Sequence, residues 1–174
     1  MKQFRNMACS ELLVPFILQW EGGFSDHPAD RGGATNRGVT LATFRQFYGS
    51  GRTVHDLRAM TDEQWMHIFR TGYWERWQAD RIASQSLANI LVDWVWASGT
   101  RGITRPQKIL GVEPDGIVGE KTLAALAARE PEGLFRRLHA ARIAFVENIV
   151  RNDPSQQVFL QGWKNRINAL VWRD

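Results

Sequence analysis

Cysteine is nearly absent from this sequence, and its scarcity excludes two classes of protein. Cys9 is the only cysteine among 174 residues. A single thiol can form no internal disulfide and cannot build a cysteine-rich metal site, so neither a disulfide-stapled domain nor a zinc-finger-type module fits. One isolated thiol is typical of synthesis in a reducing cytoplasm.

Long apolar runs are also missing. The apolar pieces are as short as residues 90–92, which Asp93 interrupts, whereas a membrane-spanning helix needs about 20 predominantly apolar residues. The basic start at residues 1–6 is followed by no apolar stretch of signal-peptide length before Ser10. The sequence therefore predicts no stable membrane insertion and no signal peptide. Its length suits one globular domain, or a main lobe with a small appended one.

Several catalytic signatures are absent. No serine stands in a Gly-x-Ser-x-Gly motif, and no histidine is paired with another at helical spacing or followed by a zinc-peptidase glutamate. The four isolated histidines are His27, His55, His67 and His139. Gly116 and Gly119 precede Glu120-Lys121, but their interval is too short for a phosphate-binding loop. We therefore expect neither a metal nor a cofactor.

No charge of one sign is concentrated anywhere in the chain. Lysine and arginine number 22 against 18 acids, a net charge of +4, and the arginines are spread along the sequence. A mildly positive surface favours polyanions, which include nucleic acids, teichoic acids and the acidic peptides of peptidoglycan. Because no basic block or recognition-helix motif is present, a nucleic-acid binder is the less favoured alternative.

Apolar residues recur at helical spacing through most of the chain, which predicts a mainly α-helical protein. We expect a first helix from about Pro15, or one turn earlier, to Glu21. A central helix should begin at Ser86 as its cap, end near Gly99 and be buried on several faces. Other starts are expected at Thr40, at the capping-box pair Thr61 and Gln64, and at Thr104 before Pro106; further helices should include residues 123–126, 134–149 and 163–171.

The helical pattern is interrupted between Phe24 and Val39, where Gly, Asp, Pro, Asn and Thr crowd together. This composition predicts a glycine-rich loop or a small β-hairpin directly after the first helix. Glycines at positions 32, 33 and 38 would let the backbone fold back tightly toward the end of that helix.

Glu21 is the most informative residue of the chain. It stands at the last turn of an apolar helix, immediately before two glycines and the polar loop. The negative end of the helix dipole and the neighbouring Trp20 and Phe24 all disfavour the ionised carboxylate, so Glu21 should hold its proton better than an exposed acid. A proton held near neutral pH is what a general acid needs.

Glycoside cleavage needs a second group beside the general acid, and the loop offers several. Asp26 and Asp30 are the acids in the loop, while Thr35 and Thr40 have hydroxyls that can hold a water molecule. An aspartate in a glycine-rich loop also commonly caps its own turn, so structural roles stay open for Asp26, Asp30 and Thr35.

Two stretches of this sequence resemble glycoside hydrolase family 108 muramidases, a family also described as secretion activator proteins and found in prophages as endolysins. They are Glu21-Gly22-Gly23-Phe24 and residues 28–40, Pro-Ala-Asp-Arg-Gly-Gly-Ala-Thr-Asn-Arg-Gly-Val-Thr. The resemblance continues through Tyr73-Trp74 and the helix around Asp93. It implies a lysozyme-like helical fold and hydrolysis of the bond between N-acetylmuramic acid and N-acetylglucosamine.

The resemblance also implies roles for individual residues. The family's catalytic glutamate falls on Glu21. A looser likeness to phage-type lysozymes places Asp30 and Thr35 in the catalytic set, although the interval between them is one residue shorter here. The residues that we expect to contact the substrate are Trp20, Tyr73, Trp74 and Asp93.

The C-terminal part carries a different motif. Asp115-Gly116 and Gly119 resemble the repeated motif of peptidoglycan-binding modules, a tight turn followed by a helix start. We therefore expect residues 1–100 to form a lysozyme-like catalytic lobe and residues 101–174 a helical peptidoglycan-binding lobe packed on it as one unit. Wall contact through the motif and a purely structural turn both remain open.

These observations favour a monomeric peptidoglycan hydrolase that is made in the bacterial cytoplasm and reaches the wall by holin-type or other non-signal release. Peptidoglycan is the expected partner, and neither nucleic acid nor a cofactor is expected. The main alternative is a catalytically silent wall-binding or secretion-assisting protein of the same fold.

Overall fold

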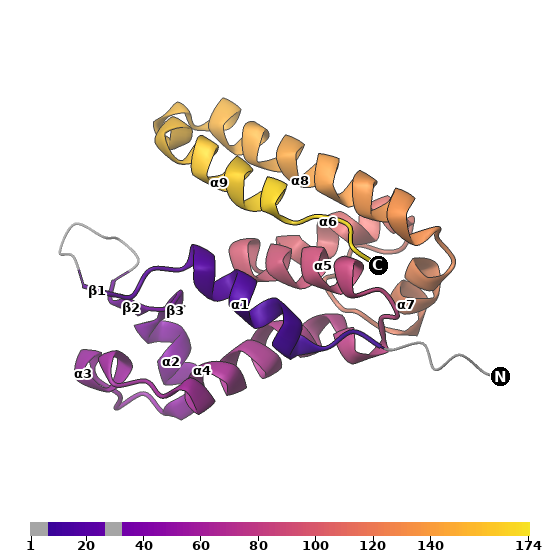
Figure 1. The fold of residues 1–174 in the computed structure, drawn as a ribbon. Helices are drawn as coiled ribbons and strands as arrows, with labels where there is room; N and C mark the ends of the chain where they lie inside the picture. Colours follow the sequence, from indigo (N-terminus) through magenta and orange to yellow (C-terminus); the bar gives the residue numbers. More distant parts are fainter. Residues whose placement is uncertain (1–6, 27–32) are drawn as a thin grey trace. The chain divides into compact units, whose positions relative to one another are not determined.

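The computed structural model describes residues 7–26 and 33–174 (Figure 1). The chain divides into two compact units, which we call the hairpin unit (Ser10–Trp74) and the helical unit (Met1–Cys9 with Glu75–Asp174). The described residues are mainly α-helical, and their one sheet follows the first helix. The predicted fold class, helices with a small β-hairpin after helix one, is confirmed.

The hairpin unit combines helices with a three-stranded antiparallel sheet of order β1-β2-β3. Its strands are β1 (Phe24–Ser25), β2 (Thr35–Asn36) and β3 (Val39–Thr40). Its helices are α1 (Ser10–Trp20), α2 (Leu41–Tyr48), α3 (Val54–Arg58), α4 (Asp62–Phe69) and the π-helical turn η1 (Arg70–Trp74). The predicted caps are confirmed, because the Thr40 side chain accepts from the Thr43 amide and Thr61 forms a capping box with Gln64.

Helix α1 begins at Ser10, so Pro15 lies inside the helix rather than in its first turn. Leu13 and Ile17 on one face of α1 are fully buried, whereas Pro15 is exposed. Proline has no N–H to donate to the carbonyl four residues before it, which weakens the helix at this point. Burial of the apolar stripe on both sides of Pro15 favours the helix nevertheless. Helix α1 therefore begins somewhat earlier than the predicted start at Pro15 or one turn before it.

The helical unit consists of longer helices joined by short turns. Its helices are α5 (Gln85–Ser98), α6 (Arg101–Leu110), α7 (Glu120–Ala127), α8 (Pro131–Asn152) and α9 (Gln157–Ala169), with short 3-10 turns η2 (Glu75–Trp77), η3 (Ala79–Arg81) and η4 (Pro154–Gln156). Within this unit α8 and α9 lie side by side and pack against each other (Figure 1). No helix of the described ranges is both long and apolar enough to cross a membrane.

The central helix α5 is buried over most of its length, as predicted. It begins two residues earlier than expected, because Ser84 and not Ser86 is the cap, its side chain accepting from the Leu87 amide at 3.0 Å. Ser86 binds the C-terminus instead: its amide and hydroxyl donate to the Asp174 carboxylate at 3.0 and 2.8 Å. Both serines have the chemistry of a cap, and the C-terminal segment decides between them.

Helix α6 also begins earlier than predicted, at Arg101 rather than near Thr104, and Pro106 lies inside it. Proline has no amide hydrogen to offer the carbonyl of Gly102 one turn before it. The Trp77 indole Nε1–H donates to that Gly102 oxygen at 3.2 Å. The partner missing from the helix is therefore replaced by a buried side chain, which allows proline within α6.

The backbone of α5 approaches Gly102 of α6 closely, and replacing this glycine with alanine should destabilise the helical unit. A Cβ atom there would lie 2.4 Å from the backbone carbon of Trp94 and from the Val95 nitrogen. Relief of such a clash requires the helices to move apart, so we expect Gly102→Ala to cost about 1–3 kcal/mol in free energy of unfolding. Urea denaturation measures this, with Gly119→Ala, where no atom lies within 4 Å, as the control; equal stabilities of the two variants would contradict the expectation.

Candidate active site

Glu21 directly follows the last residue of α1, as the sequence predicted. Its backbone N–H donates to the Ile17 carbonyl at 3.2 Å, so the residue is held by the last helical turn. The side chain is half-buried, and two exposed glycines connect it to β1 at Phe24. The acid therefore stands in the chain between α1 and the sheet.

Thr35 lies on the middle strand of the sheet. The register places it directly opposite Ser25 on β1 and opposite Thr40 on β3. Directly opposed residues of antiparallel strands hold their Cβ atoms about 4.5–5.5 Å apart, so the three hydroxyl residues form one polar row across the sheet. Asp26 follows β1 and is exposed, and Asp30 lies outside the described residues.

The β2–β3 hairpin turns through Arg37 and Gly38, which both have positive φ values of 48° and 80°. Two such residues in succession form the type I′ turn that matches the twist of a two-residue hairpin. Glycine adopts this conformation freely, whereas arginine requires compensation. That compensation comes from contacts of Arg37 with α4 and with the segment before it.

Three side chains clamp the hairpin onto the helices of its unit. The buried Asn36 amide donates to the carbonyls of Leu57 and Arg58 at 2.9 and 3.2 Å. The Arg37 guanidinium donates to the Met60 carbonyl at 2.8 Å, and the Trp65 indole donates to the Arg37 carbonyl at 3.0 Å. These contacts hold the strand that contains Thr35. None of them involves the side chains of Ser25, Thr35 or Thr40.

Asn36→Ala should loosen the hairpin and lower the stability of the hairpin unit. The substitution leaves the buried Leu57 carbonyl and the part-buried Arg58 carbonyl without their donor, a loss of about 1–3 kcal/mol in free energy of unfolding. Hydrogen exchange of the amides in β2 and β3 would report the loosening directly. Gln46→Ala, at an exposed position on the neighbouring helix α2, is the control, and unchanged exchange in the Asn36 variant would contradict the clamping role.

Trp20 is half-buried beside Glu21, and its ring lies 6.3 Å from that of Phe16. Its indole Nε1 is fully buried and has no hydrogen-bond partner among the described residues. A buried indole nitrogen usually finds an acceptor. The predicted substrate contact of Trp20 stays a prediction.

Tyr73 and Trp74 both belong to the π-helical turn η1, but they differ in exposure. Tyr73 is half-buried, whereas Trp74 is fully buried, its ring 6.5 Å from that of Phe69. A side chain without exposed surface offers none to a sugar, so Trp74 is a core residue and its predicted role in direct substrate contact is corrected. The signal was ambiguous because most tryptophans at helical spacing fill the interior.

Asp93 is likewise fully buried, on α5. Its carboxylate accepts from Arg142 of α8 at 2.9 Å and from Arg166 of α9 at 2.7 Å. The predicted direct substrate contact of Asp93 is therefore corrected to an ion-pair role inside the helical unit. Burial lowers the pKa of Arg142, and the carboxylate of Asp93 opposes that effect.

The Asp115-Gly116 turn is held together internally. The Asp115 carboxylate accepts from the Ile117 amide at 2.8 Å and from the buried Gln107 side chain at 2.9 Å, which lowers the pKa of Asp115. Gly116 has a φ of 79° and donates its amide to Gln107, and Gly119 caps α7. The turn and the helix start predicted from the motif are confirmed, and wall contact through it stays a prediction.

In the ranges 7–26 and 33–174, no group of three or more His, Cys, Asp or Glu side chains is arranged to hold a metal ion. The candidate site of the hairpin unit consists of a half-buried acid after α1, a neighbouring tryptophan and a row of hydroxyl residues on a clamped sheet. Such an arrangement can deliver a proton and position a water molecule.

Two family models and a solved structure show which protein family this chain is related to. The model described as glycosyl hydrolase 108 matches residues 14–99, and the model described as a predicted peptidoglycan domain matches residues 101–168. A solved structure of SagA from Brucella abortus is 31% identical and superposes with a TM-score of 0.81, covering 92% of this chain and 90% of that one. This chain belongs to glycosyl hydrolase family 108.

The two family matches and the solved structure establish the fold of the chain, the type of its C-terminal part and its broad function. The fold is the mainly α, lysozyme-like fold, the C-terminal part is a peptidoglycan-binding region, and the function is related to peptidoglycan. The first match spans the hairpin unit and α5, while the second covers α6 to α9. No curated protein is similar enough to match.

Proposed function

We propose that this family 108 protein is a muramidase, which cleaves the bond between N-acetylmuramic acid and N-acetylglucosamine with Glu21 as the general acid. The observation that carries the proposal is the position of Glu21: half-buried at the end of α1 and joined through two glycines to the clamped sheet. A carboxylic acid held at this position can donate the proton that the departing sugar oxygen needs.

The second catalytic requirement is a group for the developing positive charge or the attacking water. Thr35 supports this role by its place in the hydroxyl row, because a threonine side chain can hold a water by accepting and donating hydrogen bonds. Asp30 is proposed beside it on the resemblance alone. Trp20 and Tyr73, both half-buried, are proposed to contact the glycan.

The site of action that fits this activity is the cell wall, and peptidoglycan is the partner. We propose residues 1–100 as the catalytic lobe and residues 101–174 as a wall-binding lobe, the arrangement that the two family matches suggest by their boundary at residues 99 and 101. Peptidoglycan is the proposed substrate in either biological role, that of a prophage endolysin or that of a secretion-assisting protein.

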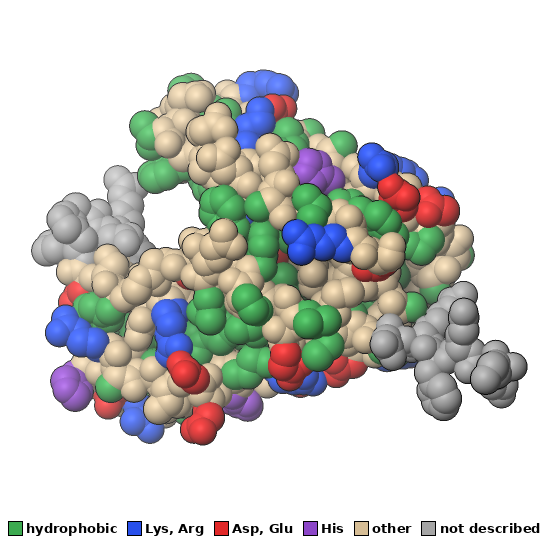
Figure 2. Space-filling view, viewed as in Figure 1, with side chains coloured by type: hydrophobic (Ala, Val, Ile, Leu, Met, Phe, Trp, Pro, Cys, Tyr) green, Lys and Arg blue, Asp and Glu red, His purple; other side chains and the backbone are tan. Residues whose placement is uncertain are grey.

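A catalytically silent wall-binding protein is the second candidate, and the peptidoglycan domain match at residues 101–168 favours it. A nucleic-acid binder has weaker support. On the face in Figure 2, Lys and Arg side chains (blue) are interspersed with Asp and Glu (red) and form no continuous basic patch, whereas nucleic-acid binding usually requires one.

Zymography separates the enzyme from the silent binder. The protein is renatured in a gel that contains purified peptidoglycan, and a cleared band is expected at its position. A parallel co-sedimentation with insoluble peptidoglycan measures binding. Binding without clearing would overturn the proposed hydrolysis and support the silent protein.

A further inference from the structure

The helical unit has a groove between α6 and α8. Its volume is about 530 Å³, and its apolar lining comprises Trp94, Ile109, Ala141, Ala144 and Phe145. Trp94 and Phe145 are 1% and 9% exposed, so they form the base of the groove, whereas Ala144 is exposed. Clefts that bind ligands enclose roughly 300–1,000 Å³. The groove is therefore large enough for a short peptide.

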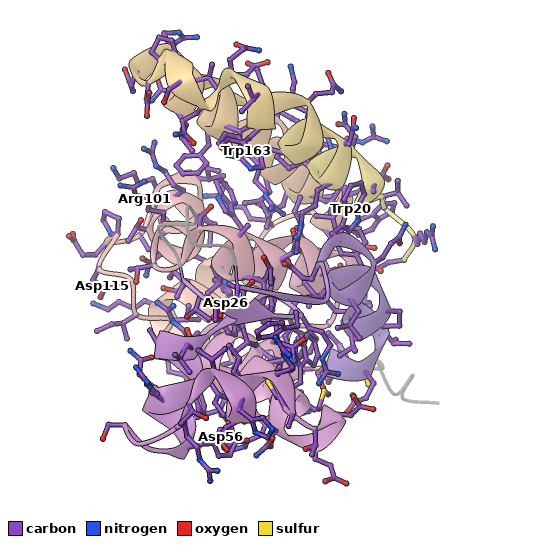
Figure 3. All side chains as sticks on the ribbon, turned by 90° about the vertical axis from the view of Figure 1, so that its left-hand side faces the viewer. Trp20, Asp26, Asp56, Arg101, Asp115 and Trp163 are labelled. Atoms are coloured by element: carbon purple, nitrogen blue, oxygen red, sulfur yellow. The ribbon has the colours of Figure 1, made fainter. Side chains whose placement is uncertain are left out.

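Three cations line this groove, and they come from both of its helices. Arg105 and Lys108 belong to α6, Arg151 belongs to α8, and all three are exposed. Residues three apart on a helix share a face, so the two cations of α6 stand side by side. Arg101, which Figure 3 labels at the start of α6, is exposed one turn before Arg105 and extends the same row.

The positive charge of the groove is not balanced by acids in the part of the chain that the structure describes. Helix α6 contains no aspartate or glutamate, and the side chains of Arg105, Lys108 and Arg151 form no ion pair or hydrogen bond with the described residues. Glu147 is the one acid in the described lining, and its carboxylate already pairs with Lys164 of α9 at 2.6 Å. Because low-dielectric walls focus the field of like charges in a cleft, the groove should concentrate anions.

Arg105 is held over the base of the groove by an aromatic contact. Its guanidinium carbon lies 5.3 Å from the centroid of the Phe145 ring, which is a cation–π distance. This contact uses the face of the ring and no acceptor atom, so the N–H donors of Arg105 stay available for an anion. A guanidinium positioned in this way can bind both oxygens of one carboxylate.

The remaining lining suits a peptide with small side chains. Ala141 and Ala144 present only methyl groups, which leaves room for a chain to lie between the helices. Asn148 is exposed on α8 and can donate to a peptide group or accept from one. Carboxylates beside the cations and small side chains over the alanines together describe an acidic, alanine-rich peptide. The peptides attached to peptidoglycan have this composition.

A nucleic acid fits the groove less well. Single-stranded nucleic acids are bound by a positive groove together with aromatic rings on which the bases stack. The two aromatic rings of this groove, Trp94 and Phe145, are too buried to offer such a face. The lining therefore favours peptide carboxylates over a phosphate backbone.

We propose that the groove between α6 and α8 binds the acidic peptides that are attached to peptidoglycan, with their carboxylates on the three cations and their methyl groups against the two alanines. The proposal rests on peptidoglycan being the polymer that this protein recognises, and it deepens the proposed function by naming the part of the polymer that is bound. Such recognition distinguishes wall that carries free peptide carboxylates from bare glycan.

The test measures binding of the free peptide, which contains no glycosidic bond and therefore cannot be cut by a muramidase. Isothermal titration of the full chain compares L-alanyl-γ-D-glutamyl-diaminopimelyl-D-alanine with the same peptide whose carboxylates are amidated. Because hydrogen bonds to charged groups are roughly twice as strong as neutral ones, amidation should weaken binding about tenfold or more.

Two variants locate the site. Lys108→Gln combined with Arg151→Gln removes one exposed cation from each helix, and Ala144→Phe fills the groove without changing its charge. Each variant should weaken binding of the unmodified peptide about tenfold. Lys121→Gln combined with Arg173→Gln is the matched control, because it removes two exposed cations of the same unit that lie outside the groove lining. The control should keep the parent's affinity.

The outcomes separate this inference from the proposed hydrolysis. Equal affinity for the two peptides, no binding of either, unchanged affinity in either groove variant, or equal weakening by the control overturns the peptide groove, even if the parent protein clears peptidoglycan. A single-stranded oligonucleotide that binds the parent more tightly than the peptide, and loses affinity in both groove variants, overturns it in favour of nucleic acid. Carboxylate-dependent peptide binding that both groove variants weaken and the control keeps supports the proposal, even if the parent protein shows no hydrolysis.

Discussion

Glu21→Gln should reduce the rate of peptidoglycan hydrolysis about 10²–10⁴-fold, the contribution typical of general acid–base catalysis. Glutamine is nearly isosteric with glutamate but has no proton of suitable acidity to give to the departing sugar oxygen. The half-buried position of the side chain should accommodate the amide without disturbing α1. The measurement is the initial rate at which new reducing ends appear in purified peptidoglycan.

The matched control is Glu63→Gln, which removes an exposed acid from α4 of the same unit. Its rate should stay within about twofold of the parent, since surface substitutions usually change stability by less than about 0.5 kcal/mol. Glu21→Gln should also keep the parent's melting temperature. A rate for Glu21→Gln equal to that of the control would exclude Glu21 as the general acid.

Asp93→Ala should lower the free energy of unfolding of the helical unit by about 3–5 kcal/mol, the cost of breaking a buried ion pair by removing one partner. The substitution leaves the cations of Arg142 and Arg166 together in a mostly buried place without their shared carboxylate. The loss should appear as a lower urea midpoint in the circular dichroism signal.

Asp62→Ala is the natural comparison, because it also breaks an arginine–aspartate pair. The Arg37–Asp62 pair is short, at 2.6 Å, but the Asp62 side chain is 97% exposed. Exposed pairs contribute about 0–1 kcal/mol, so this variant should lose little. An equal loss of unfolding free energy in both variants would show that burial does not determine how much the Asp93 ion pairs stabilise the protein.

Local patterns in the sequence predicted the elements whose causes are local. The apolar stripe of Leu13 and Ile17 identified α1, and the threonine at position 40 identified the start of α2. The composition after Phe24 predicted the hairpin. Each of these depends on residues within a few positions of one another, so spacing and capping chemistry were sufficient.

Two of the errors came from contacts over long sequence distances. Ser84 and Ser86 have equal capping chemistry, and the choice depends on Asp174, 88 residues beyond Ser86. The partners of Asp93 are 49 and 73 residues away. Arg142 falls on the apolar stripe of α8, four residues after Leu138 and three before Phe145, which indicates burial. No local pattern, however, identifies Asp93 as its partner.

The candidate site shows the same division. Glu21 could be predicted from its helix end and the glycines after it. The clamp of Asn36 on the carbonyls of α3 could not, because those acceptors are backbone atoms 21 and 22 residues away and carry no sequence signature. Trp74 and Tyr73 are neighbours with equal aromatic character, and only packing distinguishes the buried ring from the half-buried one.

The most direct test of the account is the chemistry of the ends that the protein creates. Purified peptidoglycan is digested, the soluble products are reduced with borohydride, and mass spectrometry identifies the reduced sugar. The account predicts muropeptides that end in reduced N-acetylmuramic acid with the parent protein, and none with Glu21→Gln. Products ending in reduced N-acetylglucosamine, or muramic ends formed equally by the Glu21 variant, would contradict it.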